Sequence, residues 1–405
     1  MHVSLRSSFA ALLLVPVFAC SSNESSTPAQ TADAGSDAGD GFLSPTNGWF
    51  SNPLFVVAEP AAGAKPVEIH SLAASDGKNV YVAYSTSAPG GGGNLSVFVT
   101  AFNPRGERVF APVQIAVGDA NETDTAIAVR GDTLLVAWTA STDQAHLRWR
   151  TLRTDGTLLG KVHAHTELLE GGKPLTASQL NPWVCATPTG FFVAGAWGVS
   201  SSTSFQAAGA KLSATGDVDG EIALLGGAPT DTQDGVRVAA FGDKLRATWL
   251  SAPESGAAKV KWAELPSAPA EIGAGVGADT DGQFATYNDA KGKTHLRAWG
   301  GTQDLVGFDN LGSLPSVAAD GQGGVLLLGI TGSASAKGAL HAVHVGADGR
   351  KLGESTLETS GAGISSQAAY DVKVVHITGR HFFVAYQEPT STKGWVSKGS
   401  FITVP

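Results

Sequence analysis

One short unit recurs along most of this chain and limits what it can fold into. It is a strand-length apolar run that ends in a small residue and an aromatic one. The copies are Val82-Ala83-Tyr84, Val136-Ala137-Trp138, Gly195-Ala196-Trp197, Ala247-Thr248-Trp249, Ala285-Thr286-Tyr287, a degenerate Leu328-Gly329-Ile330, and Val384-Ala385-Tyr386. Subtracting successive last residues gives intervals of 54, 59, 52, 38, 43 and 56 residues. Intervals of this size are typical of a structural unit repeated around one core.

The sequence around each copy predicts the unit itself. Another strand-like run and a glycine turn precede it, with the glycine at positions 77, 131, 190, 242, 282, 321 and 379. Tight hairpin turns favour glycine because they need positive φ. A third run and usually a fourth follow, so each unit reads as four antiparallel strands, A to D. We therefore predict an all-β fold, a single β-propeller of seven four-stranded blades.

The ends of the chain favour a closed ring. The last unit has no fourth strand, whereas Leu54–Ala58 has the character of a D strand and no blade of its own. Pairing this N-terminal strand with the last blade would remove an exposed edge. The fourth and fifth intervals are short, however, as if a strand were missing near residues 264 to 313. Six or eight blades remain alternatives.

The N-terminus carries the signals of export. An apolar run from Phe9 to Phe18 follows Arg6, which is the layout of a signal peptide over residues 1–19. Val17-Phe18-Ala19-Cys20 resembles the lipobox of bacterial lipoproteins, although Phe18 is bulkier than the residue usual there. The resemblance implies lipidation of Cys20, with palmitate-type acyl chains anchoring the protein in the membrane. Cleavage that leaves an unmodified cysteine is the alternative.

The residues after Cys20 complete the domain plan. Ser21 resembles the residue of lipoproteins sorted to the outer membrane, so the expected location is the cell envelope. Residues 20–48 contain few large apolar side chains and predict a flexible tether. From residue 49 to residue 405 the alternation of apolar runs and turns is uninterrupted, which predicts one propeller domain, expected to be monomeric. The whole chain resembles the bacterial β-propeller lipoproteins, without a motif of any particular propeller family.

Charge argues against one class of partner, and strand position accounts for three tryptophans and one cysteine. The net charge is −9 and the sequence holds no cluster of Lys and Arg, so nucleic acid is not an expected partner. Trp138, Trp197 and Trp249 stand at a repeated strand position, where packing between blades is the expectation. Cys185 falls in an A strand, where a buried, inert thiol is expected.

Two D-to-A loops supply the candidate metal ligands that the pattern favours. Both loops are expected on one face of the ring, and their acidic residues are Asp119, Glu122, Asp124, Asp231 and Asp234. Carboxylate oxygens gathered there would suit Ca²⁺ or a cationic partner. A solvated acidic rim without an ion is the alternative, and no other cofactor is expected.

Catalytic signatures are absent from the sequence: it has no G-x-S-x-G, H-E-x-x-H or paired-carboxylate motif. We therefore predict a non-catalytic binding or scaffolding module at the cell envelope, with a protein or glycan ligand left open. The alternative is an envelope hydrolase or lyase that acts on a glycan-like substrate at the channel mouth.

Overall fold

The computed structural model describes eleven stretches of the chain. They are residues 41–51, 55–58, 71–87, 94–116, 120–199, 204–226, 231–309, 311–333, 336–362, 372–390 and 394–405. All of them belong to one compact unit, Asp40–Pro405. Cys20 and Asp119 lie outside the described residues. Within these stretches, no helix combines the length and apolar character needed to cross a membrane.

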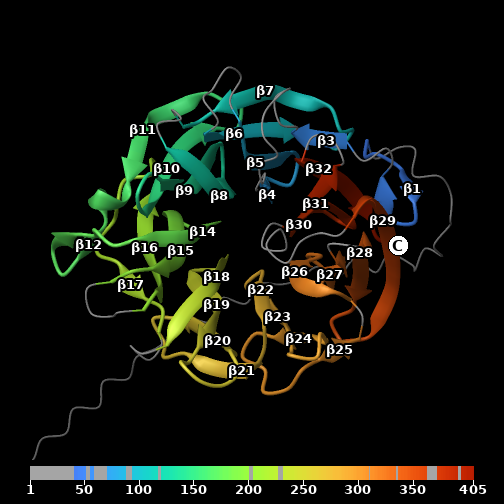
Figure 1. Cartoon of the computed structure of the whole chain (residues 1–405). Coiled ribbons are helices and arrows are strands. Elements are labelled where there is room, and N and C mark those ends of the chain that lie inside the picture. Colours follow the sequence, from blue (N-terminus) through green and yellow to red (C-terminus); the bar gives the residue numbers. More distant parts are fainter. Residues whose placement is uncertain are drawn as a thin grey trace, which may run out of the picture. The chain divides into compact units, whose positions relative to one another are not determined.

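Seven four-stranded antiparallel blades form a ring, as the repeats predict (Figure 1). Blade 1 consists of β4 (Ser71–Ser75), β5 (Val80–Ser87), β6 (Leu95–Phe102) and β7 (Arg108–Gln114). Blade 2 consists of β8 (Asn121–Arg130), β9 (Thr133–Ser141), β10 (Ala145–Arg153) and β11 (Leu158–Ala164). Blade 3 consists of β14 (Gln179–Ala186), β15 (Gly190–Trp197), β16 (Gln206–Ser213) and β17 (Ala223–Leu224). Between blades 2 and 3 lie η1 (His165–Glu167), β12 (Leu169–Glu170) and β13 (Lys173–Pro174).

The second half of the ring repeats this plan. Blade 4 consists of β18 (Thr232–Phe241), β19 (Lys244–Ala252), β20 (Lys259–Leu265) and β21 (Ala270–Ala274). Blade 5 consists of β22 (Gly277–Thr280), β23 (Phe284–Asn288), β24 (Thr294–Ala298) and β25 (Val306–Phe308). Blade 6 consists of β26 (Ser313–Ala319), β27 (Val325–Ser333), β28 (Ala336–Val345) and β29 (Lys351–Ala362). Blade 7 takes its first three strands from the C-terminus: β30 (Lys373–Thr378), β31 (His381–Thr390) and β32 (Gly394–Thr403).

Closure of the ring follows the prediction. The fourth position of blade 7 is filled by β3 (Phe55–Ala58), which pairs antiparallel with β32 (Figure 1). The same edge of β32 also pairs with β2 (Phe50–Ser51), which in turn pairs with β1 (Pro45–Asn47). Strand pairing therefore begins at residue 45, inside the segment expected to be a tether. Chain segments from both ends thus complete one sheet, which removes the edge that an open ring would expose.

The short fourth and fifth intervals come from short strands and not from a missing one. The strands of blade 5 contain four, five, five and three residues. A full set of four strands is nevertheless present between residues 277 and 308. The alternatives of six or eight blades are therefore wrong.

Positive φ, the reason for which glycine was predicted at the A-to-B turns, is confirmed at six of the seven positions. Gly77, Gly131, Gly242, Gly282, Gly321 and Gly379 all have positive φ. Gly190 does not have positive φ, and the need for glycine there has another cause: a Cβ would lie 2.1 Å from the carbonyl oxygen of Leu212. Glycine is needed at this position because the next strand passes too close for any side chain.

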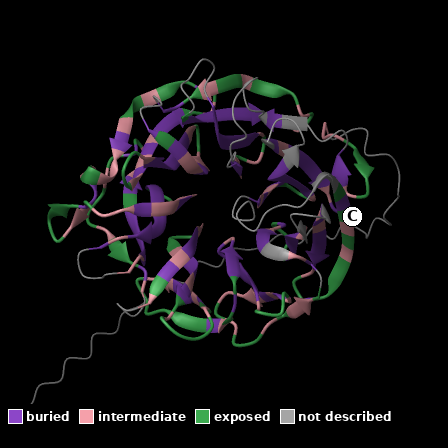
Figure 2. Ribbon diagram, in the orientation of Figure 1, coloured by how far each residue is buried: buried purple, intermediate pink, exposed green. Residues whose placement is uncertain are grey.

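The core lies between the blades. The B and C strands are largely buried, whereas exposed residues follow the outer rim along β7, β21 and β29 (Figure 2). Trp138, Trp197 and Trp249 are each fully buried, so the packing role predicted for them is confirmed. They belong to a larger set of fully buried aromatic side chains, which removes much apolar surface from water.

Strand register corrects the alignment of one copy. Glu122 pairs with Ala140 and Gln233 pairs with Ser251, each two residues beyond the tryptophan of its B strand. In blade 3 the corresponding residue, Gln179, pairs with Trp197 itself. The position equivalent to Trp138 is therefore Gly195. A Cβ on Gly195 would lie 2.8 Å from the Nε1 of Trp197, so the indole fills the space that the glycine leaves open.

Candidate functional site

The A strands of all seven blades surround a central channel. Each of them is the last strand of its sheet and has a pairing partner on one side only, among the described strands. The free edge, with its unpaired N–H and C=O groups, faces the channel, because four consecutive residues of several A strands line it instead of alternate ones. These strands enclose a cavity of about 390 Å³. Small-molecule sites commonly have volumes of about 300–1,000 Å³.

Register identifies one equivalent position in every A strand. It is the residue that pairs with the B-strand residue one before the aromatic place. Register moves this place to Gly329 in blade 6, as it does to Gly195 in blade 3, because Ser313 pairs with Ile330 and Ser316 with Leu328. The seven B-strand residues are Ala83, Ala137, Ala194, Thr248, Thr286, Leu328 and Ala385. We call the seven residues at this position the channel ring. Its members, in blade order, are Leu72, Ala126, Trp183, Arg237, Asp279, Ser316 and Lys373. Blades 1 and 2 thus supply apolar residues, and the other five supply a polar, charged or aromatic one.

A hydrogen-bonded cluster joins blades 5, 6 and 7 at the ring. The carboxylate oxygen Oδ2 of Asp279 accepts hydrogen bonds from the Ser316 hydroxyl at 3.1 Å and from the Val317 amide at 3.0 Å. The same oxygen forms an ion pair with Lys373 Nζ at 2.8 Å. The Asp279 side chain is 4% exposed and that of Lys373 is 14% exposed. Burial strengthens such a pair but also makes either charge costly if the other is removed.

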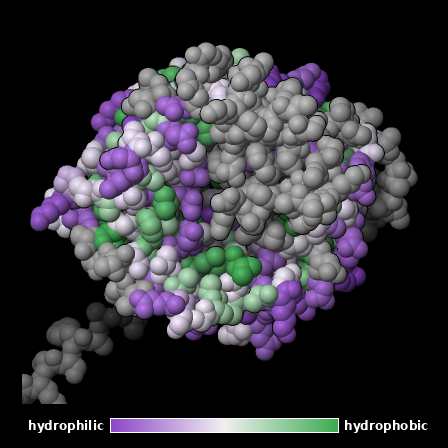
Figure 3. All heavy atoms as spheres, in the orientation of Figure 1, coloured by the Kyte–Doolittle hydropathy of each residue, from purple (hydrophilic) through white to green (hydrophobic). Residues whose placement is uncertain are grey.

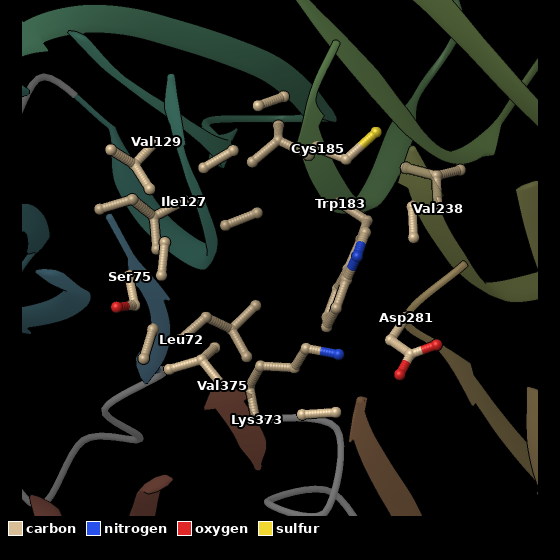
Figure 4. A pocket seen from close by; sticks show the side chains of 18 of the residues that line it. Leu72, Ser75, Ile127, Val129, Trp183, Cys185, Val238, Asp281, Lys373 and Val375 are labelled. Atoms are coloured by element: carbon tan, nitrogen blue, oxygen red, sulfur yellow. The ribbon is translucent and has the colours of Figure 1, made fainter. Parts of the chain in front are cut away.

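A cation–π cluster continues the ring through blades 3 and 4. The guanidinium carbon of Arg237 lies 4.2 Å from the centre of the Trp183 ring, and Lys373 Nζ lies 5.2 Å from it. Cations over an indole are attracted by its quadrupole, most strongly where water is excluded. Lys373 therefore connects two clusters, with Asp279 on one side and Trp183 on the other. In Figure 4 the side chains of Lys373 and Trp183 extend toward each other within the cavity.

Two further functional groups line the cavity beside the ring. Asp281 accepts hydrogen bonds from the amides of Gln283 and Phe284, both at 2.8 Å, through one carboxylate oxygen. Its other oxygen is buried and has no hydrogen-bond partner among the residues that the structure describes, and burial raises the pKa of this carboxyl group. The Cys185 thiol is half-buried, and desolvation raises its pKa to about 12. A thiol with such a pKa is protonated at neutral pH, as expected of an inert cysteine.

The described surface around the ring is uneven in character. In the view of Figure 3, hydrophilic side chains are frequent along the rim, while hydrophobic ones gather over β18 and β22 beside the channel. Val276, directly before β22, is 53% exposed.

The acidic residues predicted as metal ligands have other partners in the structure. Glu122 is fully buried in β8, where its carboxylate accepts a hydrogen bond from Trp138 and pairs with Arg148 at 3.5 Å. Asp124 also lies in β8, at a bulge with a φ of 51°. Glu122 is in a strand and not a loop because β8 begins at Asn121.

The two predicted metal ligands of blade 4 also have hydrogen-bond partners. Asp231 accepts a hydrogen bond of 2.7 Å from the hydroxyl of Ser251, and Asp234 accepts one of 2.9 Å from Asn181. Among the described residues, no three His, Cys, Asp or Glu side chains form a group that could hold a metal ion. With Asp119 outside these residues, a calcium site stays a prediction. The channel ring, in contrast, was not predicted from the sequence.

Comparisons with known proteins show the fold alone. No protein-family model matches the chain, and no curated protein matches it. Among solved structures, a protein of unknown function from Dyadobacter fermentans is 13% identical, with a TM-score of 0.50, and the match covers 87% of this chain and 99% of that one. A puromycin-hydrolyzing peptidase of Mycobacterium tuberculosis is 14% identical, with a TM-score of 0.51 and coverage of 86% and 53%.

A viral structure shares the same architecture. The hemagglutinin-neuraminidase ectodomain of parainfluenza virus 5 is 10% identical, with a TM-score of 0.50, and the match covers 90% of this chain and 86% of that one. Identities this low carry no information about ligand or reaction, since one fold hosts many functions. This chain is therefore a seven-bladed β-propeller, and its function has to be argued from its own channel.

Proposed function

We propose that this protein is a non-catalytic binding module whose ligand is a small molecule held in the central channel. The observation that carries the proposal is the cavity of about 390 Å³ at the channel ring. All seven blades contribute to its wall, so a ligand there could contact every blade at once. Free strand edges offer backbone donors and acceptors, and the apolar side chains between them offer surface for burial.

The proposal also places the protein at the cell envelope. A lipid on Cys20 would hold it in the membrane, most simply the outer membrane, while the residues that follow Cys20 would separate the propeller from the lipid surface. The sequence supports this arrangement through the lipobox-like Val17–Cys20 segment. A module displayed in this way captures or presents a ligand outside the cytoplasm.

Binding is tested by blocking the cavity. Ala74 of β4 lines it, so Ala74→Phe would fill part of the space. The matched control is Ala111→Phe on the exposed outer strand β7 of the same blade. A screen of amines, carboxylic acids and monosaccharides by calorimetry is expected to find saturable binding that Ala74→Phe removes and Ala111→Phe retains. Binding that survives the block, or turnover of a glycan substrate in a hydrolase screen, would overturn the proposal.

The anchor is tested separately. Cells that express the protein are labelled with radioactive palmitate and then fractionated. We expect label on the wild-type protein in the membrane fraction and none on Cys20→Ser. Equal labelling of the two proteins would show that Cys20 is not the acylated residue, without bearing on the channel.

A further inference from the structure

The cavity has an apolar side next to a charged group. Apart from Ser75, blades 1 and 2 line it with residues that carry no polar side-chain atom, among them Leu72, Ala74, Ile127 and Val129. Lys373 of the neighbouring blade 7 brings an ammonium group into the same cavity (Figure 4). A ligand that matched both features would be amphipathic, with one polar group and an apolar body.

Lys373 has more N–H donors than it has acceptors among the described residues. An ammonium group carries three N–H donors. Among the described residues, Lys373 Nζ has one hydrogen-bond acceptor, Asp279 Oδ2. That oxygen is already shared with Ser316 and Val317. The other N–H donors of Lys373 have no acceptor among the described residues, and Lys373 lines the cavity, where a ligand could accept from them.

Two charged side chains line the cavity close to the ring, those of Lys373 and Asp281. Asp281 accepts two backbone hydrogen bonds through one carboxylate oxygen, and burial raises its pKa. Its other oxygen has almost no accessible surface from which to contact a ligand. A ligand therefore meets the ammonium group of Lys373 more readily than the free oxygen of Asp281.

We infer that the cavity binds a small monocarboxylic acid, whose carboxylate accepts hydrogen bonds from Lys373 and whose apolar body packs against Leu72, Ile127 and Val129. A carboxylate suits this place because a charge-assisted N–H···O bond is about twice as strong as a neutral one. Each methylene group buried on the apolar side adds to the affinity. This inference rests on the proposed function, since it names the ligand class of the same cavity.

The test compares head groups on one apolar chain. Octanoate, octylamine and octanol are titrated into the purified protein by calorimetry, with butyrate as the shorter acid. We expect octanoate to bind at least tenfold more tightly than octylamine, octanol or butyrate. Octylamine or octanol binding as tightly as octanoate would overturn the choice of a carboxylate but leave the binding function standing. If no compound of the wider screen bound, the proposed function itself would fail.

Variants separate the role of Lys373 from folding. The double variant Lys373→Met, Asp279→Asn removes both charges of the buried pair, so it leaves no unpaired ion to unfold the protein. It is expected to bind octanoate at least tenfold more weakly, while Lys373→Arg keeps most of the affinity. A double variant that is folded by circular dichroism and binds octanoate as the wild type does would overturn the role of the ammonium group.

Discussion

Lys373 Nζ of blade 7 lies 2.8 Å from the Oδ2 atom of Asp279 in blade 5, across the part of the channel that blade 6 borders. This ion pair links two blades that are not neighbours in the ring. Blade 6 joins it through Ser316, whose hydroxyl donates to Asp279 and accepts from the amide of Val374. These three residues therefore connect blades 5, 6 and 7, and Lys373 also lines the cavity.

Breaking this pair is expected to destabilise the protein strongly. Lys373→Met leaves a carboxylate that is 4% exposed without its cation, which should lower the free energy of unfolding by about 3–5 kcal/mol. Combining it with Asp279→Asn should restore part of the loss. Lys259→Met is the control, because its pair with Glu271 is exposed at 48% and 41% and should contribute about 0–1 kcal/mol. Urea denaturation of the four proteins measures this, and equal losses in the two lysine variants would contradict it.

The sequence predicts the repeat more completely than it predicts the ring. Strand runs, turn glycines and the N-terminal closing strand are local or pairwise signals, and each of them appears in the structure. The ring residue stands five positions before the A-to-B glycine in blades 1, 2, 4 and 6, for example at Leu72 before Gly77. In three blades the distance differs. Trp183 of blade 3 stands seven positions before its glycine, Asp279 of blade 5 three positions and Lys373 of blade 7 six positions.

The three exceptions are the residues that carry the site. The stretch between the ring residue and the glycine differs among these blades. Three residues separate Gly190 from the end of β14, β22 ends one residue after Asp279, and a bulge between His376 and Thr378 interrupts β30. Counting positions from the glycine therefore does not find Trp183, Asp279 or Lys373. Only the pairing of the A strands with the B strands aligns the seven ring residues. The acidic residues were misplaced for a related reason: Glu122 reads as a loop residue by composition, but strand pairing extends to Asn121 and buries it.

The register of blade 3 makes a prediction about a glycine. Gly195→Ala should destabilise the protein by about 1–3 kcal/mol, because its Cβ would lie 2.6 Å from the Leu180 carbonyl oxygen and 2.8 Å from Trp197 Nε1. Gly292→Asn is the control, since its space is open and asparagine tolerates its positive φ. Thermal denaturation compares the two variants. A Gly195→Ala protein as stable as the wild type would refute the place assigned to Trp197.

Closure by β3 makes a prediction about Val57. Its side chain is 1% exposed, and its carbonyl oxygen accepts a hydrogen bond of 3.0 Å from Arg108 in blade 1. Val57→Asp would bury an unpaired carboxylate, so we expect a loss of several kcal/mol in unfolding free energy. Val109→Asp on the outer strand of blade 1, where the valine is 44% exposed, should change stability by no more than about 0.5 kcal/mol. Similar losses for both variants would mean that β3 does not stabilise the ring.

A stacked histidine pair makes the protein less stable in mild acid. His146 and His165 lie with ring centres 3.9 Å apart and an interplanar angle of 7°. Burial, with smaller contributions from His146 and Arg148, lowers the pKa of His165 to about 4. The unfolded state, in which the pKa of histidine is about 6.5, therefore binds the proton more readily. Stability contributed by the neutral ring is present above pH 6.5 and is lost as the pH falls toward 4.

Replacing the titrating ring tests this dependence. His165→Phe keeps an aromatic ring against His146 but cannot bind a proton, so its unfolding free energy should fall less steeply between pH 6.5 and 5. The difference in slope is at most about 1.4 kcal/mol per pH unit, and less because His165 is partly exposed. His341, whose pKa burial also lowers, keeps part of the slope in both proteins. Urea denaturation at several pH values gives the two slopes, and identical slopes would show that His165 is not held neutral by its surroundings.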